Sequence, residues 1–173
     1  HLSSAWFHTF RMPIIRTNCS NNFGPYQFPD KLIPLIIMKA MQNEQIPIYG
    51  DGSNIRDWLY VEDHVEALIL SATKGKIGSN YCVGGNNEKS NLEIANSICE
   101  ILDQKLPRKN SYKSLIQFVE DRPGHDKRYA INSDLIKKEL NWYPKYEFNN
   151  ALENTIDWYI KNKKWVEKVS KKN

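Results

Sequence analysis

The sequence predicts an α/β fold, because short apolar extended segments alternate along the chain with longer segments of helical periodicity. Clusters rich in Asn, Gly and Pro separate these segments and indicate loops. A folded core is expected, since 40% of the 173 residues are hydrophobic and 12% are aromatic. This length suggests one domain or two small ones.

The first half of the chain predicts several short elements in close succession. Leu2, Trp6 and Phe10 recur about one turn apart and indicate a helix. A β-branched run predicts a buried strand over 13–19, and residues 21–25 indicate a loop. The next expected elements are a helix over 31–43, a strand over 46–49, a turn at 50–52, an extended stretch over 56–60 and a helix over 62–75. The buried faces of these two helices are expected to be Leu35, Ile37, Met38 and Met41, and Val65, Leu68, Ile69 and Ala72.

The second half begins with a strand over 81–83 that ends at two glycines. Ser90 and Glu93 have the spacing of a capping box and open a helix. Its apolar face is expected to contain Ile94, Ile98, Ile101 and Leu102. A strand over 116–119, a polar loop over 121–125 and helices near 134–140 and 149–162 complete the prediction.

The net charge of +4 does not indicate a nucleic-acid partner. Six lysines against one glutamate lie from Lys161 onward, and the remaining 18 basic and 19 acidic residues nearly cancel, so the basic residues suggest a solvated helix end. Neither a membrane helix nor a secretion signal is expected. Three scattered cysteines argue against a disulfide framework, and a reducing cytoplasm is the simplest location. The histidines and cysteines lack the spacing of metal ligands, so no metal site is expected.

Common catalytic signatures, such as G-x-G-x-x-G and G-x-S-x-G, are absent from the sequence. Tyr159 and Lys163 have the Y-x-x-x-K spacing of short-chain dehydrogenases. They follow no dinucleotide-binding unit, and we expect Tyr159 to pack beside Ile156 and Trp158 instead. The sequence therefore predicts no catalytic residue in this chain.

The polar loops contain side chains suited to an anionic ligand that carries rings. Arg56 and Arg122 offer guanidinium forks for a diphosphate, and Lys31 offers a further positive charge. Tyr49 can stack or donate a hydrogen bond. The amides of Asn21, Asn22 and Asn91 can both donate and accept, as sugar hydroxyls require. Structural roles stay open: an ion pair of Arg56 with Asp57 or Glu62, a helix start at Asn91 and a turn cap at His125.

Residues 17–26 and the block Ile55-Arg56-Asp57-Trp58-Leu59-Tyr60-Val61-Glu62-Asp63-His64 resemble the extended short-chain dehydrogenases that modify nucleotide sugars. Residues 85–91, the block at 121–130 and Trp158-Tyr159 with Trp165 narrow the resemblance to the dTDP-glucose 4,6-dehydratases of that family. The block at 121–130 is the most specific of these signals. The resemblance covers essentially the whole chain in order.

The resemblance implies an NAD-dependent lyase of deoxysugar (rhamnose) biosynthesis. The family oxidises dTDP-glucose at C4, eliminates water across C5 and C6 and returns the hydride to C6. By similarity, Asn22 contacts the cofactor and Asn21 the substrate. The remaining residues expected at the substrate are Lys31, Leu32, Pro47, Ile48, Tyr49, Arg56, Asn91, Asp121, Arg122, Pro123, Gly124 and His125. The two arginines are expected at the diphosphate, and Tyr49 and His125 at the thymidine.

Relative to the family pattern, the chain lacks the glycine-rich phosphate loop, the acid and base of elimination and the catalytic Y-x-x-x-K. We therefore expect a C-terminal portion of an extended Rossmann-type dehydrogenase, inactive alone, from a protein that is a homodimer at full length. Residues 1–30 would be a remnant of the dinucleotide-binding domain, and 31–173 mainly a small mixed α/β substrate-binding domain, with about 55–85 returning to the first. Two alternatives stay open, namely another nucleotide-sugar epimerase or decarboxylase, and a non-catalytic sugar-nucleotide-binding module.

Overall fold

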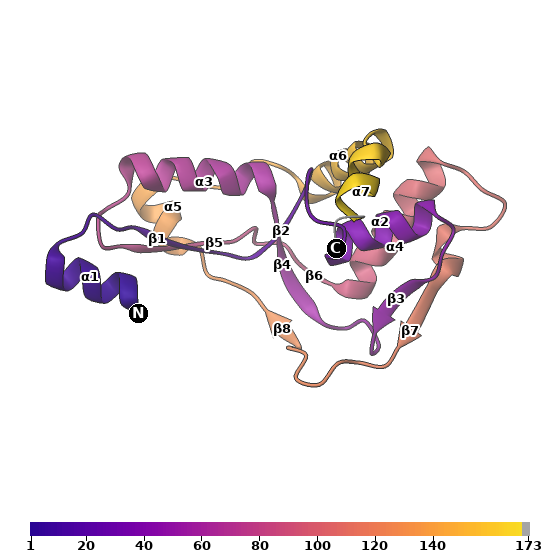
Figure 1. Ribbon diagram of the computed structural model, residues 1–173, viewed down its shortest axis with the longest axis horizontal. Coiled ribbons are helices and arrows are strands. Elements are labelled where there is room, and N and C mark those ends of the chain that lie inside the picture. Colours follow the sequence, from indigo (N-terminus) through magenta and orange to yellow (C-terminus); the bar gives the residue numbers. More distant parts are fainter. Residues whose placement is uncertain (171–173) are drawn as a thin grey trace.

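The computed structural model describes residues 1–170 and confirms the α/β prediction (Figure 1). The helices are α1 (Leu2–Phe10), α2 (Leu32–Met41), α3 (Val61–Lys74), α4 (Asn91–Lys105), η1 (Tyr112–Leu115, a 3-10 helix), α5 (Asp134–Leu140), α6 (Phe148–Lys161) and α7 (Lys163–Ser170). The strands are β1 (Arg16–Cys19), β2 (Asn21–Phe23), β3 (Ile46–Tyr49), β4 (Ile55–Tyr60), β5 (Asn80–Val83), β6 (Glu88–Ser90), β7 (Ile116–Val119) and β8 (Arg128–Tyr129). No helix in this described part is both long and apolar enough to cross a bilayer.

The strands form small, mostly parallel sheets. β1 pairs with β5 and β3 pairs with β7, both in parallel. β4 lies between β2, which is parallel to it, and β6, which is antiparallel, and β8 adds a short parallel pairing at its start. β4 thereby brings together segments from both halves of the chain.

The hydrophobic core is divided between two clusters that meet at β4. The larger cluster includes residues of α2, α4, α6 and β3, and the smaller one residues of α3, α5 and β5. Alternate side chains of β4 enter different clusters: Trp58 and Tyr60 belong to the larger cluster and Leu59 to the smaller. In Figure 1, α1, β1, β5, α3 and α5 accordingly gather at one end, and α2, α4, α6, α7, β3 and β7 at the other.

Two sequence predictions for the first strands were wrong in detail. Residues 21–23, expected in a loop, form β2 because they pair with β4, as in Asn21↔Trp58. The strand expected over 13–19 begins at Arg16 and is only half-buried. Within the described residues its ladder partner is β5 alone, so one edge of β1 has no neighbouring strand to cover it.

The buried face predicted for α3 was wrong. Val65, Leu68 and Ile69 are exposed, and the helix buries the smaller Ala67 and Ser71. Asp63 explains this rotation: its buried carboxylate accepts hydrogen bonds from the main-chain N–H groups of Lys145 at 2.8 Å and Tyr146 at 3.3 Å. Burial raises the pKa of Asp63, and these two N–H groups oppose that rise. A carboxylate that must reach those donors therefore fixes the orientation of the helix.

The buried face of α2 is also shifted from the prediction. Ile33, Ile36 and Ala40 are buried together with the expected Ile37, whereas Leu35 and Met38 are only half-buried. The apolar residues occupy most of the circumference of this helix, so the sequence pattern alone does not select one face.

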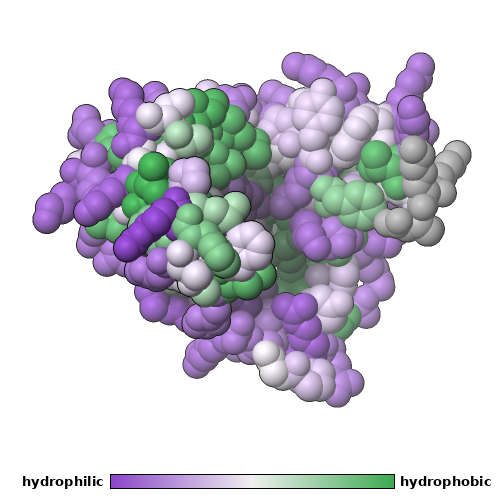
Figure 2. Space-filling model, turned by 60° about the vertical axis from the view of Figure 1, so that its left-hand side comes forward, coloured by the Kyte–Doolittle hydropathy of each residue, from purple (hydrophilic) through white to green (hydrophobic). Residues whose placement is uncertain are grey.

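Exposed apolar side chains gather at the α1 end of the molecule. Leu2 is 72% exposed and Phe10 is 67% exposed, and no residue of α1 is buried. Figure 2 brings this end forward and shows hydrophobic atoms on its surface. These residues confirm the helical periodicity predicted at the start of the chain, but the described residues do not cover its apolar side.

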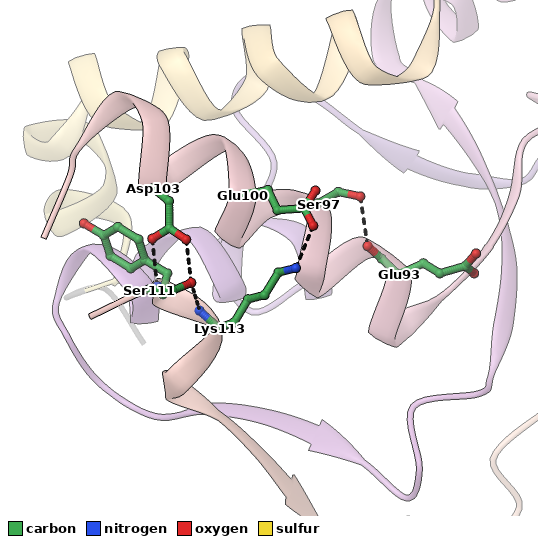
Figure 3. Close-up of polar contacts among 7 residues, drawn as sticks. Glu93, Ser97, Glu100, Asp103, Ser111 and Lys113 are labelled. Carbon is green, nitrogen blue, oxygen red and sulfur yellow. Dashed lines mark hydrogen bonds and ion pairs between the residues drawn. The ribbon is translucent and has the colours of Figure 1, made fainter. Parts of the chain in front are cut away.

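Helix α4 confirms its predicted start and face. The side-chain oxygen of Ser90 accepts a hydrogen bond from Glu93 N–H at 3.2 Å, and the Glu93 carboxylate accepts one from Ser90 N–H at 2.7 Å. Ile94, Ile98 and Leu102 are fully buried, and Ile101 packs partly buried against them. Figure 3 shows how polar contacts from Glu100 and Asp103 of this helix hold the segment around η1.

Loss of the cap should destabilise the fold measurably. Ser90→Ala removes the acceptor for Glu93 N–H, and we expect it to lower the free energy of unfolding by about 1 kcal/mol in urea denaturation. Ser97→Ala is the matched control, because the Ser97 hydroxyl only donates to the Glu93 carbonyl within the helix (Figure 3). A loss in Ser97→Ala equal to that in Ser90→Ala would contradict this assignment of the cap.

Helix α7 was not predicted as a separate helix, because the lysines from Lys161 onward suggested a solvated helix end. It is fixed by Val166, which is fully buried, and by Trp165, whose ring centroid lies 5.1 Å from that of Trp158. The basic tail predicted from Lys161 onward is thus partly a packed helix. Its last lysines, Lys171 and Lys172, lie outside the described residues.

Candidate ligand site

A cavity of about 400 Å³ lies where β2, β3, β4 and the start of α2 and α4 meet the loop after β7. This volume lies within the range of small-molecule sites. Nine residues that the sequence singled out line it, namely Asn21, Lys31, Leu32, Pro47, Tyr49, Arg56, Asn91, Arg122 and His125. Asp30, Leu35 and Trp58 complete the lining. Tertiary structure thus brings together polar groups that are up to 104 positions apart, from Asn21 to His125.

The two arginines face the same cavity, although they come from β4 and from the loop after β7. Arg56 donates from Nη1 to the Ile55 carbonyl at 2.7 Å, which orients its guanidinium and leaves its other donors for a ligand. Within residues 1–170, the ion pairs of the structure include neither arginine, so the ion pairs considered for Arg56 with Asp57 and Glu62 do not form. Both guanidinium groups can therefore bind an anion.

The charge of the cavity is predominantly positive. Lys31 adds a third basic side chain to the two arginines, and Asp30 is the acidic residue of the lining. The Lys31 ammonium lies 3.2 Å from the Asp30 carboxylate, and both side chains are more than half exposed. Such a pair is weak in water, so Lys31 keeps most of its capacity to attract an anion.

The loop over 121–125 is organised around Asp121. One oxygen of its carboxylate accepts from Arg122 N–H at 2.9 Å and lies 2.7 Å from Nδ1 of His125. Gly124 has a φ of 71°, a conformation that favours glycine. Arg122 and His125 line the cavity, whereas Asp121, Pro123 and Gly124 do not. The latter three shape the turn that presents the other two, and His125 pairs with Asp121 rather than standing free.

Strand β3 offers main-chain as well as side-chain groups. Pro47 and Tyr49 line the cavity, while the side chain of Ile48 lies on the other face of the strand and is 1% exposed in the core. Ile48 therefore contributes no side chain to the cavity. Gly50 N–H donates to the Val119 carbonyl at 2.9 Å, so by alternation Ile48 directs its main-chain groups to β7. The Pro47 carbonyl and the Tyr49 N–H consequently point away from β7, as an adjacent acceptor and donor.

The three asparagines have different environments. Asn21 lines the cavity. Asn91 is the first residue of α4, as considered from the sequence, and it also lines the cavity while its main-chain N–H donates to Asn54. Asn22 does not line the cavity: its Nδ2 donates to the Ser20 carbonyl at 3.0 Å, and its Oδ1 is buried without a partner within residues 1–170. A buried, unpaired acceptor is costly unless a donor reaches it.

Sequence reasoning missed Asp30, Leu35 and Trp58 as lining residues. Trp58 follows Arg56 by two positions on β4, so strand alternation places both side chains on the same face. Leu35 follows Leu32 by about one turn on α2. Strand periodicity from Arg56 and helical periodicity from Leu32 would therefore have predicted Trp58 and Leu35 as lining residues. No periodicity in the sequence distinguishes Asp30.

Comparison with known proteins identifies a family. The model of the family described as GDP-mannose 4,6 dehydratase matches residues 1–155. The dTDP-glucose 4,6-dehydratase of Shigella flexneri is 52% identical over 169 residues, which are 98% of this chain and 47% of that protein. The chain spans about half the length of the curated relatives it matches.

Solved structures agree with this result. The dTDP-glucose 4,6-dehydratase of Bacillus anthracis, solved in complex with NAD, is 44% identical with a TM-score of 0.89, covering 97% of this chain and 51% of that one. The corresponding enzyme of Streptomyces venezuelae is 34% identical with a TM-score of 0.90, covering 97% of this chain and 50% of that one. This likeness confirms the fold expected from the sequence, part of an extended Rossmann-type dehydrogenase.

Proposed function

Because the chain belongs to the GDP-mannose 4,6 dehydratase family, we propose that it supplies the nucleotide-sugar-binding part of an NAD-dependent dTDP-glucose 4,6-dehydratase. The observation that carries the proposal is the pair of guanidinium groups, from Arg56 and Arg122, that face one cavity. Each fork can donate two charge-assisted hydrogen bonds to phosphate oxygens. With Lys31 beside them, they suit the diphosphate at the centre of such a substrate.

The base of the nucleotide is proposed to bind at β3 and the loop after β7. A pyrimidine such as thymine presents an N–H donor next to a carbonyl acceptor. The Pro47 carbonyl and the Tyr49 N–H offer the complementary acceptor and donor, and they point away from β7. Tyr49 and His125 add ring surface to the lining of the cavity. The proposed order along the cavity is therefore base at Tyr49, diphosphate at the arginines and sugar towards Asn21.

Asn22 is proposed to contact the cofactor. Its buried Oδ1, unpaired within the described residues, fits an amide N–H donor such as the carboxamide of NAD. A bound NAD would supply the hydride-transfer chemistry that such a reaction requires. The role of this chain's residues is to bind and orient the substrate. The basic side chains bind the diphosphate, and the asparagine amides form hydrogen bonds with the hydroxyl groups of the sugar.

We also propose that the acid, the base and the Y-x-x-x-K of the reaction lie outside these 173 residues, in the half of the relatives that the chain does not match. The smaller core cluster, with β1, β5 and α3, would then belong to the dinucleotide-binding part, and the larger one to the substrate-binding part. We further propose that the full-length enzyme is a cytoplasmic homodimer.

Titration calorimetry with dTDP and UDP tests the assigned ligand. We expect dTDP to bind, and to bind more tightly than UDP, to this polypeptide. The Pro47 and Tyr49 main-chain pair suits uracil as well as thymine, so a UDP-sugar enzyme is the second candidate. Tighter binding of UDP would favour that candidate, and absence of binding by both nucleotides would reject the proposed site.

An activity assay tests the proposal that the catalytic groups lie outside these 173 residues. We expect no conversion of dTDP-glucose by the 173-residue polypeptide with NAD added, because binding without proton and hydride transfer leaves the chemical barrier unchanged. Chromatographic separation of substrate and the 4-keto-6-deoxy product is the measurement. Turnover that scales with the concentration of the polypeptide would contradict the proposal.

A further inference from the structure

The segment between β2 and α2, residues 24–31, connects two walls of the ligand cavity. It begins directly after Asn21, Asn22 and Phe23 of β2 and ends at Lys31, which precedes α2. Asn21 and Lys31 both line the cavity. The shape of this segment therefore sets how far apart these two proposed ligand contacts lie.

A hydrogen bond from Gln27 closes the segment onto β2. Its side-chain Nε2 donates to the Asn22 carbonyl at 2.7 Å. Tyr26 beside it has a φ of 63°, a left-handed conformation that is uncommon for a non-glycine residue. Tertiary contacts must hold such a backbone in place.

Helices α6 and α7 provide these contacts. The fully buried Tyr159 donates from its hydroxyl group to the Gln27 carbonyl at 2.5 Å. The ring centroid of Tyr26 lies 4.6 Å from that of Trp158 and 5.5 Å from that of Trp165. Burial raises the pKa of Tyr159, so its hydroxyl group stays protonated and can donate at physiological pH. The tyrosine of the Y-x-x-x-K match thus has a donor role within the fold.

We propose that Gln27 and Tyr159 are positioning residues for the sugar end of the cavity. Neither lines the cavity. Tyr159 holds the main chain of Gln27, and the Gln27 side chain holds the main chain of Asn22, next to Asn21. Helices α6 and α7 thereby hold the main chain at Asn21, the residue proposed to form hydrogen bonds with the sugar. This inference rests on the proposed function, since it takes the ligand of Asn21 to be the sugar of dTDP-glucose.

The test compares the affinities of dTDP and dTDP-glucose in the same variants. Gln27→Met keeps the length of the side chain but removes the donor, and Tyr159→Phe removes only the hydroxyl group. In each variant, we expect the Kd for dTDP-glucose to rise while the Kd for dTDP stays the same. The ratio of the Kd for dTDP to the Kd for dTDP-glucose should therefore fall about two- to tenfold, which corresponds to the loss of one hydrogen bond. The double variant should show about the same fall as one single variant, because both bonds act through one segment.

Tyr143→Phe is the matched control, because Tyr143 is 54% exposed and does not line the cavity, and it should leave the ratio unchanged. A merely structural role would weaken both ligands equally and leave the ratio unchanged in the test variants too, which would overturn the inference. Failure of the wild-type polypeptide to bind dTDP would instead reject the proposed function, and the inference with it. Additive effects in the double variant would show two independent contacts and would also overturn the shared role.

Discussion

Arg56→Ala and Arg122→Ala are each expected to weaken the binding of dTDP about tenfold to a hundredfold, as the loss of charge-assisted hydrogen bonds to a diphosphate implies. The two guanidinium groups face one cavity from different elements, and neither has an ion pair within residues 1–170 that would compete for it. Titration calorimetry of each variant with dTDP is the measurement. The affinity of the wild type should also fall as salt is added, since exposed charges are screened.

Two further variants separate charge from geometry. Arg56→Lys keeps the charge but loses the planar fork, so it should recover only part of the lost affinity. Arg128→Ala removes an arginine that already pairs with Glu88 at 2.6 Å and does not line the cavity, so it should bind dTDP like the wild type. Equal losses in Arg128→Ala and Arg56→Ala would point to net charge rather than a specific contact, and full affinity in both Arg56→Ala and Arg122→Ala would reject the diphosphate site.

Asp57→Ala is expected to lower the free energy of unfolding by about 3 kcal/mol or more, through loss of two charge-assisted hydrogen bonds. Asp57 is 1% exposed, and its carboxylate accepts from Gly85 N–H at 3.0 Å and from Asn87 N–H at 2.8 Å. Its replacement leaves both partly buried N–H donors without this acceptor. The segment that they hold is closely packed, since a Cβ added at Gly85 would lie 2.0 Å from the Trp58 carbonyl oxygen.

Urea denaturation followed by circular dichroism measures this loss. The control is Asp126→Ala, because Asp126 is exposed and its removal should not change the unfolding midpoint. Asp57 is the neighbour of Arg56 on β4, so unfolding of the Asp57→Ala variant would also abolish dTDP binding. The dTDP affinity of this variant should therefore be measured at a temperature where it is still folded. A midpoint for Asp57→Ala within error of the wild type would show that the two N–H groups find other acceptors.

The sequence could predict which types of side chain the candidate site contains, but not how these side chains are arranged in space. Arginine forks, amides and an aromatic ring within or after extended segments suit an anionic ligand that carries rings, wherever these side chains lie in the fold. The sequence could not show that Ile48 faces the core while its neighbours Pro47 and Tyr49 line the cavity, because a short apolar strand has no alternation of polar and apolar residues. It also could not assign Tyr159, whose partner is 132 positions away.

The sequence by itself determined the longer helices, most of the longer strands and the capped start of α4, because these depend on interactions between residues a few positions apart. Only the tertiary structure decided that residues 21–23 form a strand and that α3 buries Ala67 rather than Leu68. Both outcomes depend on partners distant in the chain: the ladder with β4, and the main chain at Lys145 and Tyr146 that holds Asp63. The local sequence pattern limits which faces of a helix or strand can be buried, and in these two cases hydrogen bonds to distant residues decide which face or pairing forms.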